Sequence, residues 1–95
     1  MPLSIPARDA PQTQFTFPCL FPIKVMGYWA EDFDAFVTQI VRRHAPDLAE
    51  AAVRTRVSQG GRYMAVTVTI EAQSQQQVDA IYRDLTGERR VVMAL

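Results

Sequence analysis

The chain lacks most of the chemistry on which enzymes depend. Its 95 residues include one cysteine, Cys19, and one histidine, His44. A single cysteine cannot form an internal disulfide, which agrees with a reducing compartment. The histidine has no second ligand at metal-binding spacing, and no nucleophile motif surrounds the cysteine. The sequence therefore predicts no catalytic residue, no metal site and no cofactor, and we expect a protein that is not an enzyme.

Neither sign of charge is in excess, because ten lysines and arginines balance ten aspartates and glutamates. A dedicated nucleic-acid binder usually carries a basic excess that neutralises phosphates, so nucleic acid is not the expected partner. No apolar run is long enough to cross a bilayer, and the first residues lack the basic-then-apolar pattern of a signal peptide. The composition predicts a cytoplasmic protein without a membrane partner.

Prolines divide the chain into two parts. Pro2, Pro6 and Pro11 interrupt residues 1–14, where the neighbouring side chains are small or polar. This stretch predicts a flexible N-terminal tail. Residues 15–95 have the apolar content and the regular patterns of a single folded domain.

Two periodicities alternate along that domain. Strand-like alternation with period two runs through residues 21–27, 53–58, 63–72 and 90–95. Helical stripes run through residues 31–45 and through a second segment that begins at Ser74. Two helices are enough to cover one face of four strands, and right-handed crossovers place the first and third strands in the centre. The sequence predicts an α+β fold, a ferredoxin-like βαββαβ sandwich with antiparallel strand order 4-1-3-2 and both helices on one face.

Some residues carry local expectations. Ser74 and Gln77 have the spacing of a capping box, and Gly87 is placed to cap the end of the same helix. Gly27 is expected to let the chain turn from the first strand into the first helix. In the last strand, Val91, Met93 and Leu95 are expected on the core face. His44 is interpreted as a cation at a helix C-terminus, where the helix dipole favours it.

The uncovered sheet face is the most informative surface. Alternation assigns to it a mixture of cationic and apolar side chains: Lys24, Met26, Arg54, Arg56, Tyr63, Ala65, Thr67, Arg90 and Val92. Such a face is either simply solvated or used for binding. RNA-recognition domains of this topology stack bases on aromatics of the central strands, but here Tyr63 is the one well-placed aromatic. The candidate interaction surface comprises Lys24, Met26, Gly27, Arg54, Arg56, Tyr63, Thr67 and Val92.

Several stretches, taken in order, resemble one known family. They are Phe17-Pro18, residues 21–27, 43–46, 58–63 and 66–70, Ile81-Tyr82 and residues 91–95. The chain resembles the YbeD-like family of small bacterial proteins of unassigned function. The resemblance implies the same fold, a likeness to ACT-type regulatory domains, which pair their sheets and bind small effectors, and a link to lipoate metabolism. It transfers no catalytic residue, and Ala65 stands where relatives are expected to have serine.

Two functions remain open. The first is a non-catalytic regulatory or adaptor module that binds a small metabolite or a protein partner through the open face. The alternative is a nucleic-acid-associated module that uses the basic residues Lys24, Arg54, Arg56, Arg62 and Arg90. A homodimer through the sheet edges is a separate expectation, against which Arg54 and Arg56 argue.

Overall fold

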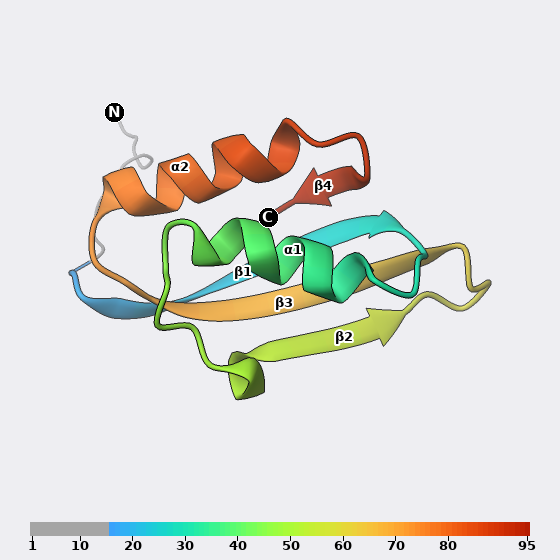
Figure 1. The fold of residues 1–95 in the computed structure, drawn as a ribbon, viewed down its shortest axis with the longest axis horizontal. Helices are drawn as coiled ribbons and strands as arrows, with labels where there is room; N and C mark the ends of the chain where they lie inside the picture. Colours follow the sequence, from blue (N-terminus) through green and yellow to red (C-terminus); the bar gives the residue numbers. More distant parts are fainter. Residues whose placement is uncertain (1–15) are drawn as a thin grey trace, which may run out of the picture.

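The computed structural model describes residues 16–95. The predicted tail, residues 1–14, lies outside the described residues, as does Phe15, where the predicted domain begins. Along the chain the elements are β1 (Cys19–Tyr28), α1 (Phe33–Arg42), the short 3₁₀ helix η2 (Glu50–Ala52), β2 (Val53–Val57), β3 (Tyr63–Ala72), α2 (Gln75–Thr86) and β4 (Val91–Ala94), as drawn in Figure 1.

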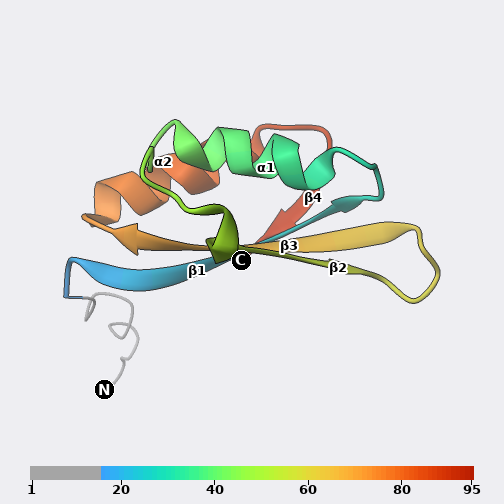
Figure 2. The same cartoon turned by 60° about the horizontal axis from the view of Figure 1, so that its bottom comes forward.

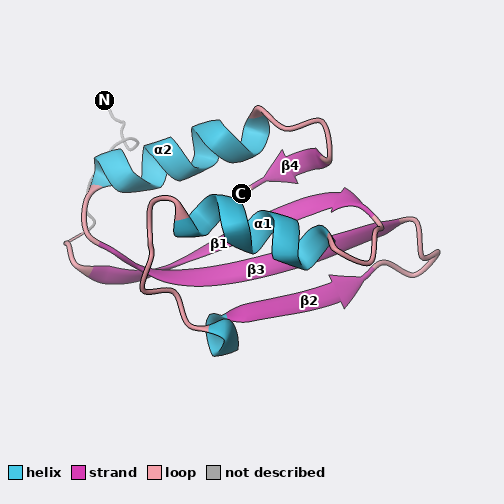
Figure 3. Ribbon diagram, in the orientation of Figure 1, coloured by secondary structure: helices cyan, strands magenta, loops and turns pink. Residues whose placement is uncertain are grey.

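The four strands form one antiparallel sheet in the order β2-β3-β1-β4 (Figure 3). Both helices lie on the same side of this sheet, and its other face is left uncovered by them (Figure 2). The long central strands β1 and β3 pair along their whole length, from Cys19 opposite Ala72 to Tyr28 opposite Tyr63. The predicted βαββαβ order and the predicted strand order are both confirmed.

The core lies between the inner face of the sheet and the two helices. The strands β1 and β3 alternate buried with exposed side chains, and each helix turns one apolar stripe toward them. The buried apolar residues are Ile23, Val25, Phe33, Val37, Ile40, Val41, Met64, Val66, Val68, Ile70, Ala72, Val78, Ile81 and Leu85. Burial of each large aliphatic side chain contributes about 1.5–3 kcal/mol, so this single layer holds the fold together.

The second helix begins as its capping residues predict. The Gln77 backbone N–H donates to Ser74 Oγ over 3.1 Å. The Gln77 side chain differs from a standard capping box, because its Oε1 accepts from the backbone N–H of Gln73, one residue before the cap. Gly87 is the C-cap, with an ordinary φ of −78°. The helix α1 is shorter than predicted, since residues 31–32 and 43–45 lie outside it.

The last strand departs from strict alternation. Gly27 pairs with Val91 and Met26 pairs with Met93, so Val92 is an extra residue in a β-bulge. Beyond the bulge the facing of the side chains is reversed, and Ala94, opposite Val25, packs against the core. The expectation that Met93 and Leu95 face the core is therefore wrong, and Leu95 is 63% exposed.

Gly27 has a different role from the predicted one. It lies inside β1 and not at a turn. A Cβ at this position would stand 2.3 Å from Phe33 Cζ and 2.4 Å from the carbonyl oxygen of Arg90. Only a residue without a side chain lets the α1 phenylalanine and the chain before β4 approach this closely.

Arg90 is also misplaced by the sequence pattern. Its guanidinium lies on the helix side of the sheet, 4.4 Å from the ring centroid of Phe36, and not on the open face. Its Nη2 is 2.7 Å from Asp32 Oδ1, and this hydrogen bond holds the pKa of Asp32 below its ordinary value. Arg90 thus ties the entrance of β4 to the start of α1.

The close approach at Gly27 yields a testable prediction. Gly27→Ala should lower the free energy of unfolding by about 1–3 kcal/mol, because overpacking a tight core forces side chains or backbone to shift. Urea unfolding followed by circular dichroism measures the change. Gly60→Ala is the matched control, since nothing lies within 4 Å of a Cβ there. Equal stability of the two variants would contradict the packing described here.

Candidate functional site

The open face of the sheet is built from rows of side chains that cross the strands. The register aligns Arg56, Ala65, Met26 and Met93 in one row across all four strands. The next row carries Arg54, Thr67 and Lys24 on β2, β3 and β1. Toward the β2–β3 hairpin, the rings of Tyr28 and Tyr63 pack with centroids 5.5 Å apart.

A groove of about 420 Å³ runs along the part of this face formed by β1, β2 and β3. We call it the open-face groove. It is lined by Lys24, Met26, Arg54, Thr55, Arg56, Val57, Ser58, Tyr63, Met64, Ala65 and Thr67. Met26 and Ala65 supply apolar surface between the longer cationic side chains.

The charged side chains that line the open-face groove are all positive. Lys24, Arg54 and Arg56 line it, and no carboxylate does. Within residues 16–95, no ion pair or hydrogen bond engages these three side chains. Cationic groups without an internal partner raise the local concentration of anions. An arginine fork can bind a carboxylate or phosphate through two parallel hydrogen bonds.

Most of the predicted surface is brought together here. The groove contains Lys24, Met26, Arg54, Arg56, Tyr63 and Thr67 from the candidate interaction surface. Gly27 does not belong to it, because its position in β1 faces the core and is filled by Phe33. Val92 does not either, because the bulge removes it from the row of Met26. Met93 takes the place predicted for Val92.

The open face also carries apolar residues that the sequence pattern missed. Tyr28 and Met93 are both about half exposed, at 56% and 45%. Tyr28 could have been found by extending the alternation of the first strand by one step. Met93 could not, since its facing depends on the bulge.

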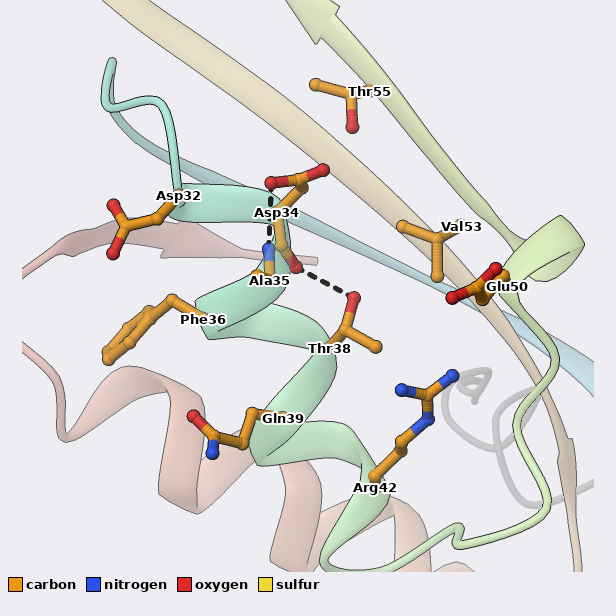
Figure 4. Close-up of a pocket in the computed structure, with 10 residues that line it drawn as sticks. All are labelled: Asp32, Asp34, Ala35, Phe36, Thr38, Gln39, Arg42, Glu50, Val53 and Thr55. Carbon is orange, nitrogen blue, oxygen red and sulfur yellow. Dashed lines mark hydrogen bonds between the residues drawn. The ribbon is translucent and has the colours of Figure 1, made fainter.

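A second hollow, of about 640 Å³, separates α1 from β2 (Figure 4). We call it the α1–β2 cleft. On its β2 side Val53 packs against the core, whereas Thr55 is exposed. Its lining residues are Asp32, Asp34, Ala35, Phe36, Thr38, Gln39, Arg42, Glu50, Val53 and Thr55.

The charged groups of the α1–β2 cleft are of both signs, and several already have partners. Asp34 Oδ1 accepts from the Ala35 backbone N–H over 2.8 Å, and Arg42 Nη2 donates to the Leu48 carbonyl over 3.1 Å. Asp32 is paired with Arg90. The open-face groove, where the cations have no partner within the described residues, is therefore the stronger candidate site.

His44 is engaged in structure. Its Nε2 lies 2.7 Å from Asp84 Oδ2 on α2, and Gln77 Nε2 donates to its backbone carbonyl over 2.7 Å. These contacts tie the turn after α1 to α2. Cys19 packs beside the core on β1, and no hydrogen bond in the described chain joins it to His44. Residues 16–95 contain no group of three or more histidine, cysteine or acidic side chains that could hold a metal ion.

None of the helices in the described part of the chain has the length and apolarity needed to cross a membrane.

Comparison with known proteins gives the family. The family described as "Protein of unknown function (DUF493)" matches residues 12–95. A UPF0250 protein of Chromobacterium violaceum is 52% identical over 87 residues, which are 92% of this chain and 98% of that protein. The chain belongs to the DUF493 family. The resemblance to YbeD-like proteins is confirmed, because YbeD is a protein of this family.

Other DUF493 relatives and one solved structure agree. A UPF0250 protein of Paraburkholderia phytofirmans is 42% identical over 84 residues, 88% of this chain and 94% of that protein. The solution structure of HP0495 from H. pylori superposes with a TM-score of 0.70 at 14% identity, covering 96% of this chain and 94% of that one. At that identity the likeness supports the fold of the DUF493 chain alone.

The contact between His44 and Asp84 yields a prediction about acid titration. The hydrogen bond from His44 is the main cause that holds the pKa of Asp84 below its ordinary value, and the charges of Arg43 and Arg83 add to it. His44→Ala should move the Asp84 midpoint upward, as measured by carboxyl carbon shifts against pH. Arg43→Gln is the control and should move it less, because Arg43 Nη1 lies 3.8 Å away.

The same lowered pKa fixes the sign of the stability effect. Asp84 stabilises the fold above the unfolded pKa of about 3.9, and this contribution is lost as the pH falls through the lower native value. The stability difference between the parent and His44→Ala should therefore narrow in acid. An unchanged Asp84 midpoint in His44→Ala would show that the contact does not form in solution.

Proposed function

We propose that this DUF493 protein is a non-catalytic regulatory or adaptor module that binds a small anionic metabolite in the open-face groove. The observation that carries the proposal is the set of three cations, Lys24, Arg54 and Arg56, that converge on the groove without an internal partner among residues 16–95. A regulator has to bind its ligand selectively but does not have to catalyse a reaction. A site made of cationic, hydroxyl and apolar side chains agrees with that role.

The groove sets the chemistry of the ligand. Its volume of about 420 Å³ is within the range of roughly 300–1,000 Å³ usual for small-molecule sites. A carboxylate or phosphate would bind between Arg54 and Arg56, and the Tyr63 hydroxyl offers a further donor. A short apolar part of the ligand would lie on Met26 and Ala65. The module would thus select a compact anion with a short hydrocarbon portion.

The link to lipoate metabolism, implied by the family resemblance, remains a prediction. Lipoate and octanoate both join a carboxylate to a short apolar chain, so they have the chemistry that the groove selects. The cytoplasmic location is likewise part of the proposal, and it agrees with a regulator of soluble metabolites.

Nucleic acid is the competing occupant. Phosphates could approach the same three cations, but the Tyr63 ring packs against Tyr28 at 5.5 Å, with the two planes 33° apart. Base stacking would need the same Tyr63 ring, which is already packed against Tyr28. The balanced charge of the chain adds no long-range attraction for phosphates. The small metabolite is therefore the better-supported ligand.

The proposal predicts which substitutions weaken binding. Amide and methyl NMR shifts would be followed while amino acids, lipoate, octanoate and a short single-stranded oligonucleotide are added in turn. For a compound that shifts Met26, Ala65 and Thr67, Arg56→Glu should raise Kd at least about tenfold, equivalent to about 1.4 kcal/mol. Tyr63→Ala should weaken the same binding without unfolding the protein.

Arg89→Glu is the matched control, because it reverses an arginine that lies before β4 and outside the groove. Its Kd should be unchanged. Binding that falls equally in Arg89→Glu and Arg56→Glu would contradict a localised site. Salt-sensitive binding of the oligonucleotide alone would replace the metabolite with nucleic acid.

A further inference from the structure

The outer edge of β2 is an unpaired strand edge. β2 is at the end of the sheet and pairs with β3 alone. The Val53 backbone N–H donates to the Glu50 carbonyl at the end of η2, and in the described chain the backbone groups of Thr55 and Val57 have no partner outside the β2–β3 pairing. An exposed edge of this kind is a template for another strand.

The direction of the free backbone groups follows from the hairpin. The Ser58 backbone N–H donates to the Tyr63 carbonyl over 2.8 Å, so Ser58 and Tyr63 form a hydrogen-bonded pair. In an antiparallel ladder such pairs alternate, which makes Arg56 and Arg54 the next residues bonded to β3. The N–H and C=O groups of Thr55 and Val57, and the C=O group of Val53, therefore point away from β3 and are open to another strand.

The side chains of β2 differ between the two faces of the sheet. Arg54 and Arg56 stand on the open face, where they have no partner within the described residues. Val53 and Thr55 both line the α1–β2 cleft (Figure 4). A strand added here would meet cations on one face and the α1–β2 cleft on the other.

A second copy of this chain does not fit the edge. β2 reads Val-Arg-Thr-Arg-Val, which is the same in both directions. Antiparallel self-pairing centred on Thr55 places Arg54 opposite Arg56 of the other copy, twice. Like charges directly opposite one another destabilise a strand pair. The edge therefore selects a partner of opposite charge.

We propose that the edge of β2 binds an extended acidic segment of a partner protein as an added antiparallel strand. Acidic side chains of the segment would face Arg54 and Arg56, and its alternate β-branched side chains would enter the α1–β2 cleft beside Val53 and Thr55. The backbone groups of Thr55 and Val57 and the carbonyl of Val53 would supply the main-chain hydrogen bonds. The proposal for the β2 edge does not rest on metabolite binding in the open-face groove, although both sites would use Arg54 and Arg56.

A synthetic peptide tests the proposal directly. A capped peptide that alternates glutamate with valine should bind the full chain, slow hydrogen exchange at the amides of Thr55 and Val57, and weaken with added salt. The same peptide with lysine for glutamate should bind at least about tenfold more weakly. N-methylation of its valines should abolish binding, and N-methylation of its glutamates should not, since antiparallel pairing turns the valine amides toward β2.

Thr55→Pro gives the complementary protein variant. It removes an outward N–H without removing a β2–β3 hydrogen bond, a position where an edge strand tolerates proline. Peptide binding should be lost in Thr55→Pro. Tyr63→Ala, which should weaken binding of a small anion in the open-face groove, should leave peptide binding unchanged. If Thr55→Pro does not fold, the comparison of the two N-methylated peptides still tests whether the peptide binds as an added strand. Equal binding of both methylated peptides, or of the lysine and glutamate peptides, would overturn the proposal.

Discussion

The structure depends on the burial of one face of two long central strands. Alternating residues of β1 and β3 point their aliphatic side chains to one side, where α1 and α2 cover them. Two helices can cover one face of a four-stranded sheet and no more. The other face, with its cations and half-buried apolar groups, is therefore exposed by the same constraint that creates the core.

The parts of the fold that follow from side-chain periodicity could be predicted from the sequence. The alternation in β3 and the stripes of α1 and α2 identify the core, because burial acts on every second residue of a strand and every third or fourth of a helix. The predicted first strand begins at residue 21, two residues later than β1, because proline is expected near the start of a strand and not inside one. β4 pairs only with the later part of β1, so Pro22 lies where β1 has a neighbour on one side alone.

Side-chain alternation also predicts most of the candidate site. The prediction fails where the strand β4 departs from regular alternation. Parity along three strands places Lys24, Arg56 and Thr67 on the open face correctly. Val92 and Arg90 were misplaced because a bulge and a contact with α1 override parity at the short β4 strand. The α1–β2 cleft has no local signal, since it arises from where α1 lies over the sheet. The edge of β2 joins the two surfaces, because Arg54 and Arg56 border the groove while its inner residues line the cleft.

We expect the open face of the sheet to be free in solution and to carry a positive potential. Paramagnetic relaxation of the protein by two small soluble nitroxides, one anionic and one cationic, tests it most directly. The anionic probe should broaden the resonances of Met26, Ala65 and Thr67 more than the cationic probe does, while the exposed residues of α2 should show no such preference. Equal broadening by both probes, or protection of Met26 and Ala65 from both, would contradict it.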